Sequence, residues 1–163
     1  MRRRDTLIVF VRQPALGRVK RRLAADLGAV AARRIYAGLT RRALGRLAGA
    51  PTWRTVLAVT PDRARWRGWP RRVARVGQGG GDLGTRMGRA LRRLATPRAV
   101  LIGWRRGVWP AGALAGVRWS SAHALADSRA TLPAATVVAL VDTLTDLDDA
   151  AAYRAWRARR QPG

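Results

Sequence analysis

The stretch Leu7-Ile-Val-Phe-Val11 decides the fold of this chain. It is a short, continuous apolar run rich in β-branched residues, and Arg12 and Pro14 follow it closely. Such a run is typical of a strand that is buried on both faces of a parallel sheet. From about Val19 apolar residues recur at helical spacing, and Gly28 is expected to divide this part into two helices because glycine readily ends a helix.

Further apolar runs and helical patterns alternate along the rest of the chain. They predict strands at Thr55–Thr60, Val73–Val76, Ala99–Ile102 and Thr136–Val141. They predict helices that begin at Asp82 or Thr85, that cover Ser120–Ser128, and that run from Asp146 to about Arg159. Strands and helices that alternate in this way predict a layered α/β domain with a mainly parallel sheet.

The length and composition exclude several classes of protein. A chain of 163 residues is expected to form one domain, over residues 1–163. It has no apolar run near the roughly 20 residues that a membrane helix needs, and its basic N-terminus lacks the apolar length of a signal peptide. Because it has no cysteine, disulfides, thiolate metal sites and thiol nucleophiles are excluded. A cytoplasmic location is therefore expected.

The charge balance is strongly basic. The chain has 33 basic and 9 acidic residues and a net charge of +24; its acidic side chains are all aspartates, and Lys20 is its single lysine. One interpretation is binding of nucleic acid or another polyanion. The other is a solvated basic surface whose affinity for polyanions is weak and sensitive to salt.

The loop after the first strand is the first candidate site. A loop between a buried strand and a helix presents backbone N–H groups to an anion, and Gly17 allows a close approach of the backbone. Arg12, Arg18, Lys20 and Arg22 add cations suited to a diphosphate. The loop matches neither the Walker A nor the dinucleotide motif, since it has a single glycine. A solvated basic turn is the alternative.

A glycine-rich loop is the second candidate site. Its glycines give the backbone freedom, its aspartate can accept a hydrogen bond from a ribose or base, and its arginine can contact a phosphate. The alternative is an ordinary connection in which the aspartate caps the next helix. The residues of this candidate site are Gln78, Gly79, Gly80, Gly81, Asp82 and Arg86.

The order of these motifs resembles a bacterial glycosyltransferase-like family that has a GT-A-type nucleotide-diphospho-sugar transferase fold. The matching phrases are Leu7–Val11, Pro14–Leu23, Ala58–Pro61, Gln78–Met87, Val100–Gly103, Trp119–Ser121 and Leu144–Asp149. The family has lysine where this chain has Arg12, and threonine where it has Arg21.

The resemblance implies a three-layer, Rossmann-like α/β domain that binds a nucleotide or nucleotide-sugar donor and transfers a glycosyl or nucleotidyl group to an acceptor. It implies that Arg12, Lys20 and Arg22 hold the phosphates and that Gly17 is the close-approach residue. It places the loop from Gln78 to Arg86 beside the nucleotide or the acceptor. It also implies a divalent cation, Mg²⁺ or Mn²⁺.

The sequence departs from the family after Gly103. Family members continue there into Thr-Asp-Cys-Pro, whose aspartate is the metal-binding acid, whereas this chain runs directly into Trp104-Arg105-Arg106. The simplest account is that about 40–50 residues are missing, the size of a strand–helix–strand unit. The domain is then abbreviated, and its principal metal ligand and its catalytic residues are not identified. Arginine and lysine can clamp phosphates without a metal, so the alternatives are a transferase with impaired or lost activity and a non-enzymatic basic protein that binds polyanions.

Three other features receive structural interpretations. His123, four residues before Asp127, is interpreted as a surface or capping histidine, because one histidine is too few for most zinc sites. The acidic run Asp142, Asp146, Asp148 and Asp149 is interpreted as helix capping, with cation binding as the alternative. Seven tryptophans among arginines are a feature of stacking platforms for single strands. These seven lack a repeating spacing, so most are expected to be buried in the core or packed against arginines.

Overall fold

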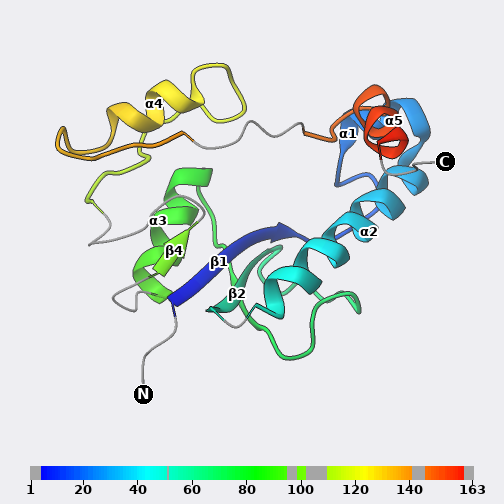
Figure 1. The fold of residues 1–163 in the computed structure, drawn as a ribbon, viewed down its shortest axis with the longest axis horizontal. Helices are drawn as coiled ribbons and strands as arrows, with labels where there is room; N and C mark the ends of the chain where they lie inside the picture. Colours follow the sequence, from blue (N-terminus) through cyan, green and yellow to red (C-terminus); the bar gives the residue numbers. More distant parts are fainter. Residues whose placement is uncertain (1–4, 51, 95–98, 102–109, 141–145, 160–163) are drawn as a thin grey trace.

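A parallel sheet of four strands forms the centre of the protein (Figure 1). The computed structural model describes residues 5–50, 52–94, 99–101, 110–140 and 146–159. The strands are β1 (Asp5–Arg12), β2 (Trp53–Thr60), β3 (Ala74–Gly77) and β4 (Ala99–Leu101), and they lie in the order β3-β2-β1-β4. The predicted α/β class with a parallel sheet is confirmed, and each of these strands overlaps one expected from the sequence.

The order of the strands determines where a ligand can bind. β1 and β2 pair along their full lengths, from Asp5 opposite Trp53 to Arg12 opposite Thr60. The chain moves outward from β1 to β2 and β3, and then returns past β1 to form β4 on its other side. In open parallel sheets, ligands bind beyond the carboxyl ends of the strands where the direction of winding reverses. In this protein that place lies beyond Arg12, the last residue of β1.

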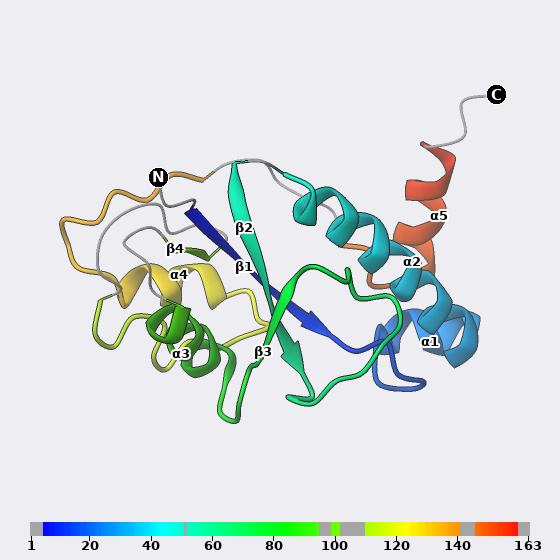
Figure 2. The ribbon, with the colours of Figure 1, turned by 90° about the horizontal axis from the view of Figure 1, so that it is seen from below.

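Two helices cover the two faces of the sheet and make three layers. On one face, Ile8 and Ala58 pack against Leu91 of α3 (Leu83–Leu94). On the other face, residues of β1 and β2 pack against Leu44 of α2 (Ala29–Ala48). Figures 1 and 2 show α2 and α3 on either side of the strands. Alternate side chains of β1 therefore enter two different cores, as expected for a strand buried on both faces.

A third apolar cluster lies beyond the sheet and joins three helices. Leu23 of α1 (Arg21–Leu27), Ala32 of α2 and Ala150 of α5 (Ala150–Ala158) are buried together. Gly28 separates α1 from α2 with φ of 81°, a left-handed value that favours glycine, so the predicted division at this residue is confirmed. α5 begins later than predicted, after Asp149, whose carboxylate accepts a hydrogen bond from the Ala152 N–H (2.8 Å).

The predicted strand at Thr136–Val141 is wrong for the part that the structure describes. Residues 136–140 belong to neither the sheet nor a helix, and 94% of Val137 and 67% of Leu140 is exposed. Val141 lies outside the described residues. A β-prone sequence forms a strand only where a neighbour offers hydrogen bonds and cover, and composition does not reveal whether that neighbour exists.

Two smaller expectations concern where a helix begins and where a strand ends. α4 (Ala124–Ala130) falls mainly within the helix expected at residues 120–128, but it begins four residues later. Ile102, the predicted end of the β4 strand, lies outside the described residues. In the part of the chain that the structure describes, no helix combines the length and the apolar character that crossing a membrane requires.

The core between the sheet and α2 gives a test of this fold. Leu57 is fully buried there, so Leu57→Ala is expected to lower the free energy of unfolding by about 2–5 kcal/mol in urea denaturation. Val137→Ala removes an apolar side chain from the exposed segment. It is expected to change the free energy of unfolding by less than about 0.5 kcal/mol. Equal losses in the two variants would show that residues 136–140 are packed after all.

Candidate functional site

The loop that leaves β1 is fastened to the elements around it. The Gln13 N–H donates to the Thr60 carbonyl of β2 (2.9 Å), and Nε of Arg33 donates to the Pro14 carbonyl (3.1 Å). The Tyr36 hydroxyl donates to the Arg12 carbonyl (3.1 Å) and accepts from the Arg12 N–H (3.3 Å). Since Arg33 and Tyr36 both lie on α2, the sheet and this helix together fix where the loop begins.

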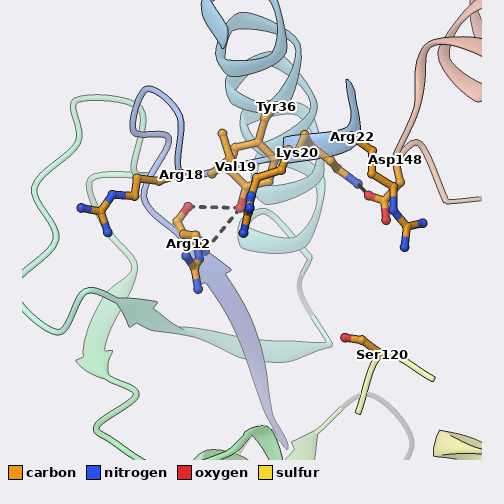
Figure 3. Close-up of a pocket in the computed structure, with 9 residues that line it drawn as sticks. Arg12, Arg18, Val19, Lys20, Arg22, Tyr36, Ser120 and Asp148 are labelled. Atoms are coloured by element: carbon orange, nitrogen blue, oxygen red, sulfur yellow. Dashed lines mark hydrogen bonds and ion pairs between the residues drawn. The ribbon is translucent and has the colours of Figure 1, made fainter. Parts of the chain in front are cut away.

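A cavity of about 460 Å³ lies against this loop, at the carboxyl end of β1. Figure 3 shows Arg12, Lys20 and Asp148 around it. The structure thus brings together the four cations of this loop that were singled out from the sequence. The residues that line the cavity are Arg12, Arg18, Val19, Lys20, Arg21, Arg22, Tyr36, Ser120 and Asp148.

Gly17 is in the loop but not among the residues that line the cavity. Its φ is 66°, in the left-handed region that favours glycine. A Cβ at this position would meet nothing within 4 Å. In the described structure, therefore, the turn of the backbone accounts for glycine at this position, and the predicted close approach to a ligand remains a prediction.

Lys20 already has two counterions. Its Nζ lies 2.8 Å from Oδ1 of Asp146 and 2.6 Å from Oδ1 of Asp148, both in the segment that precedes α5. Partial burial lowers the pKa of Lys20, but hydrogen bonding and attraction to Asp146 and Asp148 outweigh it, so the net pKa is raised. The hydrogen bond from Lys20 holds the pKa of Asp146 below its usual value. A phosphate at Lys20 must compete with these two carboxylates.

This pairing corrects the interpretation of the acidic run. Asp149 caps α5 as expected, but Asp146 and Asp148 bind Lys20 instead of capping a helix. The sequence offered no local signal for these contacts, because 126 and 128 residues separate the partners. Asp142 lies outside the described residues. Tyr36 was also missed, since its place in a helical pattern does not mark it as part of a site.

Gln78, the first residue of the second loop, has structural contacts. Its buried side chain donates from Nε2 to the Ala58 carbonyl (2.8 Å) and the Val11 carbonyl (3.4 Å). Its backbone N–H donates to the Val59 carbonyl (3.1 Å). Gln78 therefore ties the second loop to the carboxyl ends of β1 and β2, the same edge of the sheet from which the first loop departs.

The glycines of the second loop are held by an arginine. Nη1 of Arg89 donates to the carbonyls of Gln78 (2.8 Å) and Gly80 (2.9 Å). Gly79 has φ of 75°, and a Cβ there would collide with the Arg89 guanidinium. Gly81 has φ of 95°, and its carbonyl accepts from Nε of Arg86 (2.7 Å). Arg86 thus contacts its own loop.

Asp82 acts as a helix cap in the described structure. Its Oδ1 accepts from the Thr85 N–H (2.7 Å) at the start of α3. Hydrogen bonds from the Thr85 side chain and backbone lower the pKa of the Asp82 carboxyl. None of the residues from Gln78 to Arg86 is among those that line the cavity beside β1. The assignment of this loop to the nucleotide or acceptor stays a prediction.

The hydrogen bond between Asp127 and His123 joins their backbones: the Asp127 N–H donates to the His123 carbonyl (2.8 Å). Asp127 forms a bidentate pair with Arg118, whose Nη2 lies 2.8 Å from Oδ1 and whose Nε lies 2.9 Å from Oδ2. The hydrogen bonds from Arg118 strongly lower the pKa of Asp127. His123 is exposed at the residue before α4. Among the described residues, no group of three or more histidine or acidic side chains could hold a metal ion.

Comparison with known proteins confirms the fold. A model of a bacterial family, described as an uncharacterized protein conserved in bacteria (DUF2064), matches residues 43–105. A solved structure from Desulfovibrio desulfuricans G20, provisionally described as a nucleotide-diphospho-sugar transferase, is similar with a TM-score of 0.51 and 25% identity. The similarity covers 57% of this chain and 42% of that chain. No curated protein matches significantly.

These findings confirm the resemblance that the sequence indicated. The chain resembles a bacterial family and has a nucleotide-diphospho-sugar transferase fold. The similar region amounts to less than half of the solved protein's length, which fits an abbreviated domain. Residues 102–109, which include the predicted junction after Gly103, lie outside the described residues.

The Lys20 ion pairs predict how stability depends on pH. Because the pKa of Asp146 is lowered, its contribution is present above the usual carboxyl value of 3.8 and is lost as the pH falls through the lowered pKa. Because the pKa of Lys20 is raised, its contribution is present below 10.5 and is lost as the pH rises through the raised pKa. We expect Lys20→Met to lower the free energy of unfolding by about 1 kcal/mol in the pH range between these two pKa values, and by less outside that range.

Urea denaturation across the pH range measures this difference. The control is Arg46→Met, which removes an exposed cation from the last turn of α2. It is expected to leave the shape of the pH profile unchanged. A Lys20→Met profile parallel to that of the wild-type protein at every pH would contradict the ion pairs.

Proposed function

We propose that this protein is a glycosyltransferase-like or nucleotidyltransferase-like protein, and that the cavity beside β1 binds the diphosphate of a nucleotide or nucleotide-sugar donor. One observation carries the proposal: Arg12, Lys20 and Arg22 line one cavity at the carboxyl end of β1. That cavity lies where the strand order reverses in a nucleotide-diphospho-sugar transferase fold. The cation cluster alone would suit any anion, and the similarity in fold is the reason for proposing an activated nucleotide.

The charges of the cavity support a diphosphate. Arginine binds phosphate through two parallel N–H donors, so Arg12 and Arg22 can each hold one phosphate group. Lys20 can contribute a third cation when the phosphate displaces Asp146 and Asp148. The Ser120 hydroxyl is a further donor among the lining residues.

In a transfer reaction, the donor's bond to its diphosphate breaks and the acceptor takes the glycosyl or nucleotidyl group. Negative charge then develops on the departing phosphate, and fixed guanidinium groups stabilise it. Arg12 and Arg22 are the groups proposed for this task. The residue that would deprotonate the acceptor is not identified.

The described residues do not fit a divalent cation held by the protein. Asp148 is the carboxylate that lines the cavity, and it is paired with Lys20. Asp146, its neighbour in the segment, is paired with the same ammonium. We therefore propose that the cations of the loop bind the phosphates without the Mg²⁺ or Mn²⁺ that the family resemblance implies.

The second candidate function is that of a non-enzymatic basic protein that binds polyanions. The observation that favours it is the net charge of +24, which attracts any polyanion at low salt. Selectivity for a nucleotide base separates the two functions, since a purely electrostatic interaction is indifferent to the base.

Thermal shift with nucleoside diphosphates and nucleotide-sugars tests the proposed function. We expect one base to raise the melting temperature more than the others, with and without Mn²⁺. Arg12→Ala/Arg22→Ala is expected to weaken binding of that nucleotide at least about tenfold, because each arginine contributes a charged hydrogen bond. Arg42→Ala/Arg46→Ala removes the same amount of charge from α2 and is expected to change the affinity for that nucleotide less than about twofold.

Two results would contradict the proposal. One is an equal loss of nucleotide binding in both double variants. The other is an equal shift in melting temperature with every nucleotide, with heparin and with unrelated DNA, where all of these shifts disappear together as salt is added. The second result would favour the non-enzymatic polyanion-binding protein.

The competition at Lys20 gives a second test. Asp148→Asn removes one carboxylate from the cavity and frees Lys20 in part. We expect it to raise the affinity for inorganic pyrophosphate about three- to tenfold in isothermal titration. Asp149→Asn is the matched control, because asparagine also caps helices and the charge lost lies one residue away. If both variants gained affinity equally, the effect would come from net charge and not from Lys20.

A further inference from the structure

A second cavity, of about 530 Å³, lies where the connection between β2 and β3 meets β3. It shares no lining residue with the cavity beside β1. Backbone hydrogen bonds from Ala64 to Pro61, from Trp69 to Trp66 and from Val73 to Pro70 fold the connection into turns. The residues that line the second cavity are Trp66, Arg67, Trp69, Arg71 and Arg75.

Three exposed arginines give this cavity its charge. Arg67 and Arg71 come from the connection and Arg75 from β3. A fourth arginine, Arg41 of α2, lies over the Trp66 ring at 5.4 Å from its centre. The five lining residues include no carboxylate, so an anion at this cavity does not compete with a lining acid, in contrast to the situation at Lys20.

Two tryptophans form the aromatic wall of the cavity; Trp66 is half-buried and Trp69 is buried. Trp66 and Trp69 pack edge to face with ring centres 4.8 Å apart. Trp69 is 5% exposed and packs in the core with Leu44 and Leu57. A Cβ at Gly68 would collide with the Trp66 ring, so glycine at this position allows the ring to lie against the backbone. The expectation of tryptophans in the core or against arginines is confirmed for these two.

The Trp69 indole also leaves a hydrogen-bond donor unused. Its Nε1 is buried and has no partner among the described residues. A buried N–H without an acceptor costs about 1–3 kcal/mol.

We propose that the Trp66–Arg75 cavity binds single-stranded nucleic acid. Single strands are bound by aromatic side chains that pack against bases and by arginines that contact the backbone phosphates. This cavity combines both groups without a carboxylate, and a net charge of +24 draws the strand to the protein. A duplex keeps its bases stacked inside, and a polyanion without bases uses only the arginines. The aromatic wall therefore favours a single strand with free bases over a duplex and over a polyanion without bases.

Fluorescence anisotropy with a labelled oligothymidine of about 15 nucleotides tests the proposal on the full chain. Arg71→Ala/Arg75→Ala is expected to weaken binding about tenfold. Arg92→Ala/Arg93→Ala removes the same charge from exposed positions on α3 and is expected to weaken it less than about twofold. An equal loss in both variants would overturn the proposal, because binding would then follow net charge alone.

The contribution of the bases is measured with an abasic strand of the same length and with the matching duplex. Both are expected to bind at least about tenfold more weakly than oligothymidine at the same salt concentration. Trp66→Leu is expected to remove this preference, and Trp66→Phe to retain most of it. Equal binding of the abasic strand, the duplex or heparin would overturn the proposal, as would thymidine monophosphate binding as tightly as the strand.

Separate controls test whether each variant is folded and whether the strand binds at the cavity beside β1. Circular dichroism and thermal melting establish that each variant is folded, and the exposed arginine variants carry the test if Trp66→Leu does not fold. Arg12→Ala/Arg22→Ala is expected to retain binding of oligothymidine. Loss of strand binding in that variant would place the strand at the cavity beside β1 and would overturn the assignment to the Trp66–Arg75 cavity.

Discussion

Pairing of β1 on both of its edges is the constraint on which the rest of the structure depends. β2 lies along one edge and β4 along the other, and a helix covers each face. A strand enclosed in this way cannot shift its register without moving its apolar side chains to the wrong face. The residues after Arg12 therefore leave the sheet at a defined point. The first loop, its tether to Tyr36 and the cavity beside it all follow from that point.

The aspartates of this arginine-rich chain are used mainly to hold the backbone and one lysine. Asp146 and Asp148 neutralise Lys20. Five others each accept a hydrogen bond from a backbone N–H; they are Asp26, Asp62, Asp82, Asp127 and Asp149. Hydrogen bonds lower the pKa of Asp82 and Asp127, because they stabilise the charged carboxylate. These two aspartates are therefore poor general bases.

The parts of the fold that were predicted from the sequence depend on local chemistry. The apolar run of β1, the left-handed break at Gly28 and the cap at Asp82 are each encoded within a few residues. The strand expected at Thr136–Val141 failed because strand formation needs a partner that composition does not reveal. Gln78 was expected near a ligand, yet its buried amide joins two strands. The counterions of Lys20 could not be predicted, since they lie more than a hundred residues away in sequence.

That separation has a consequence for the synthesis of the protein. The basic loop at residues 12–22 leaves the ribosome long before Asp146 and Asp148 are translated. During this interval the ammonium group of Lys20 is without the carboxylates that hold it in the finished molecule, and the nascent chain is surrounded by ribosomal RNA. Formation of the two ion pairs is thus a late event in the life of the nascent polypeptide. Once the two pairs have formed, an anion that binds the Lys20 ammonium must compete with these carboxylates.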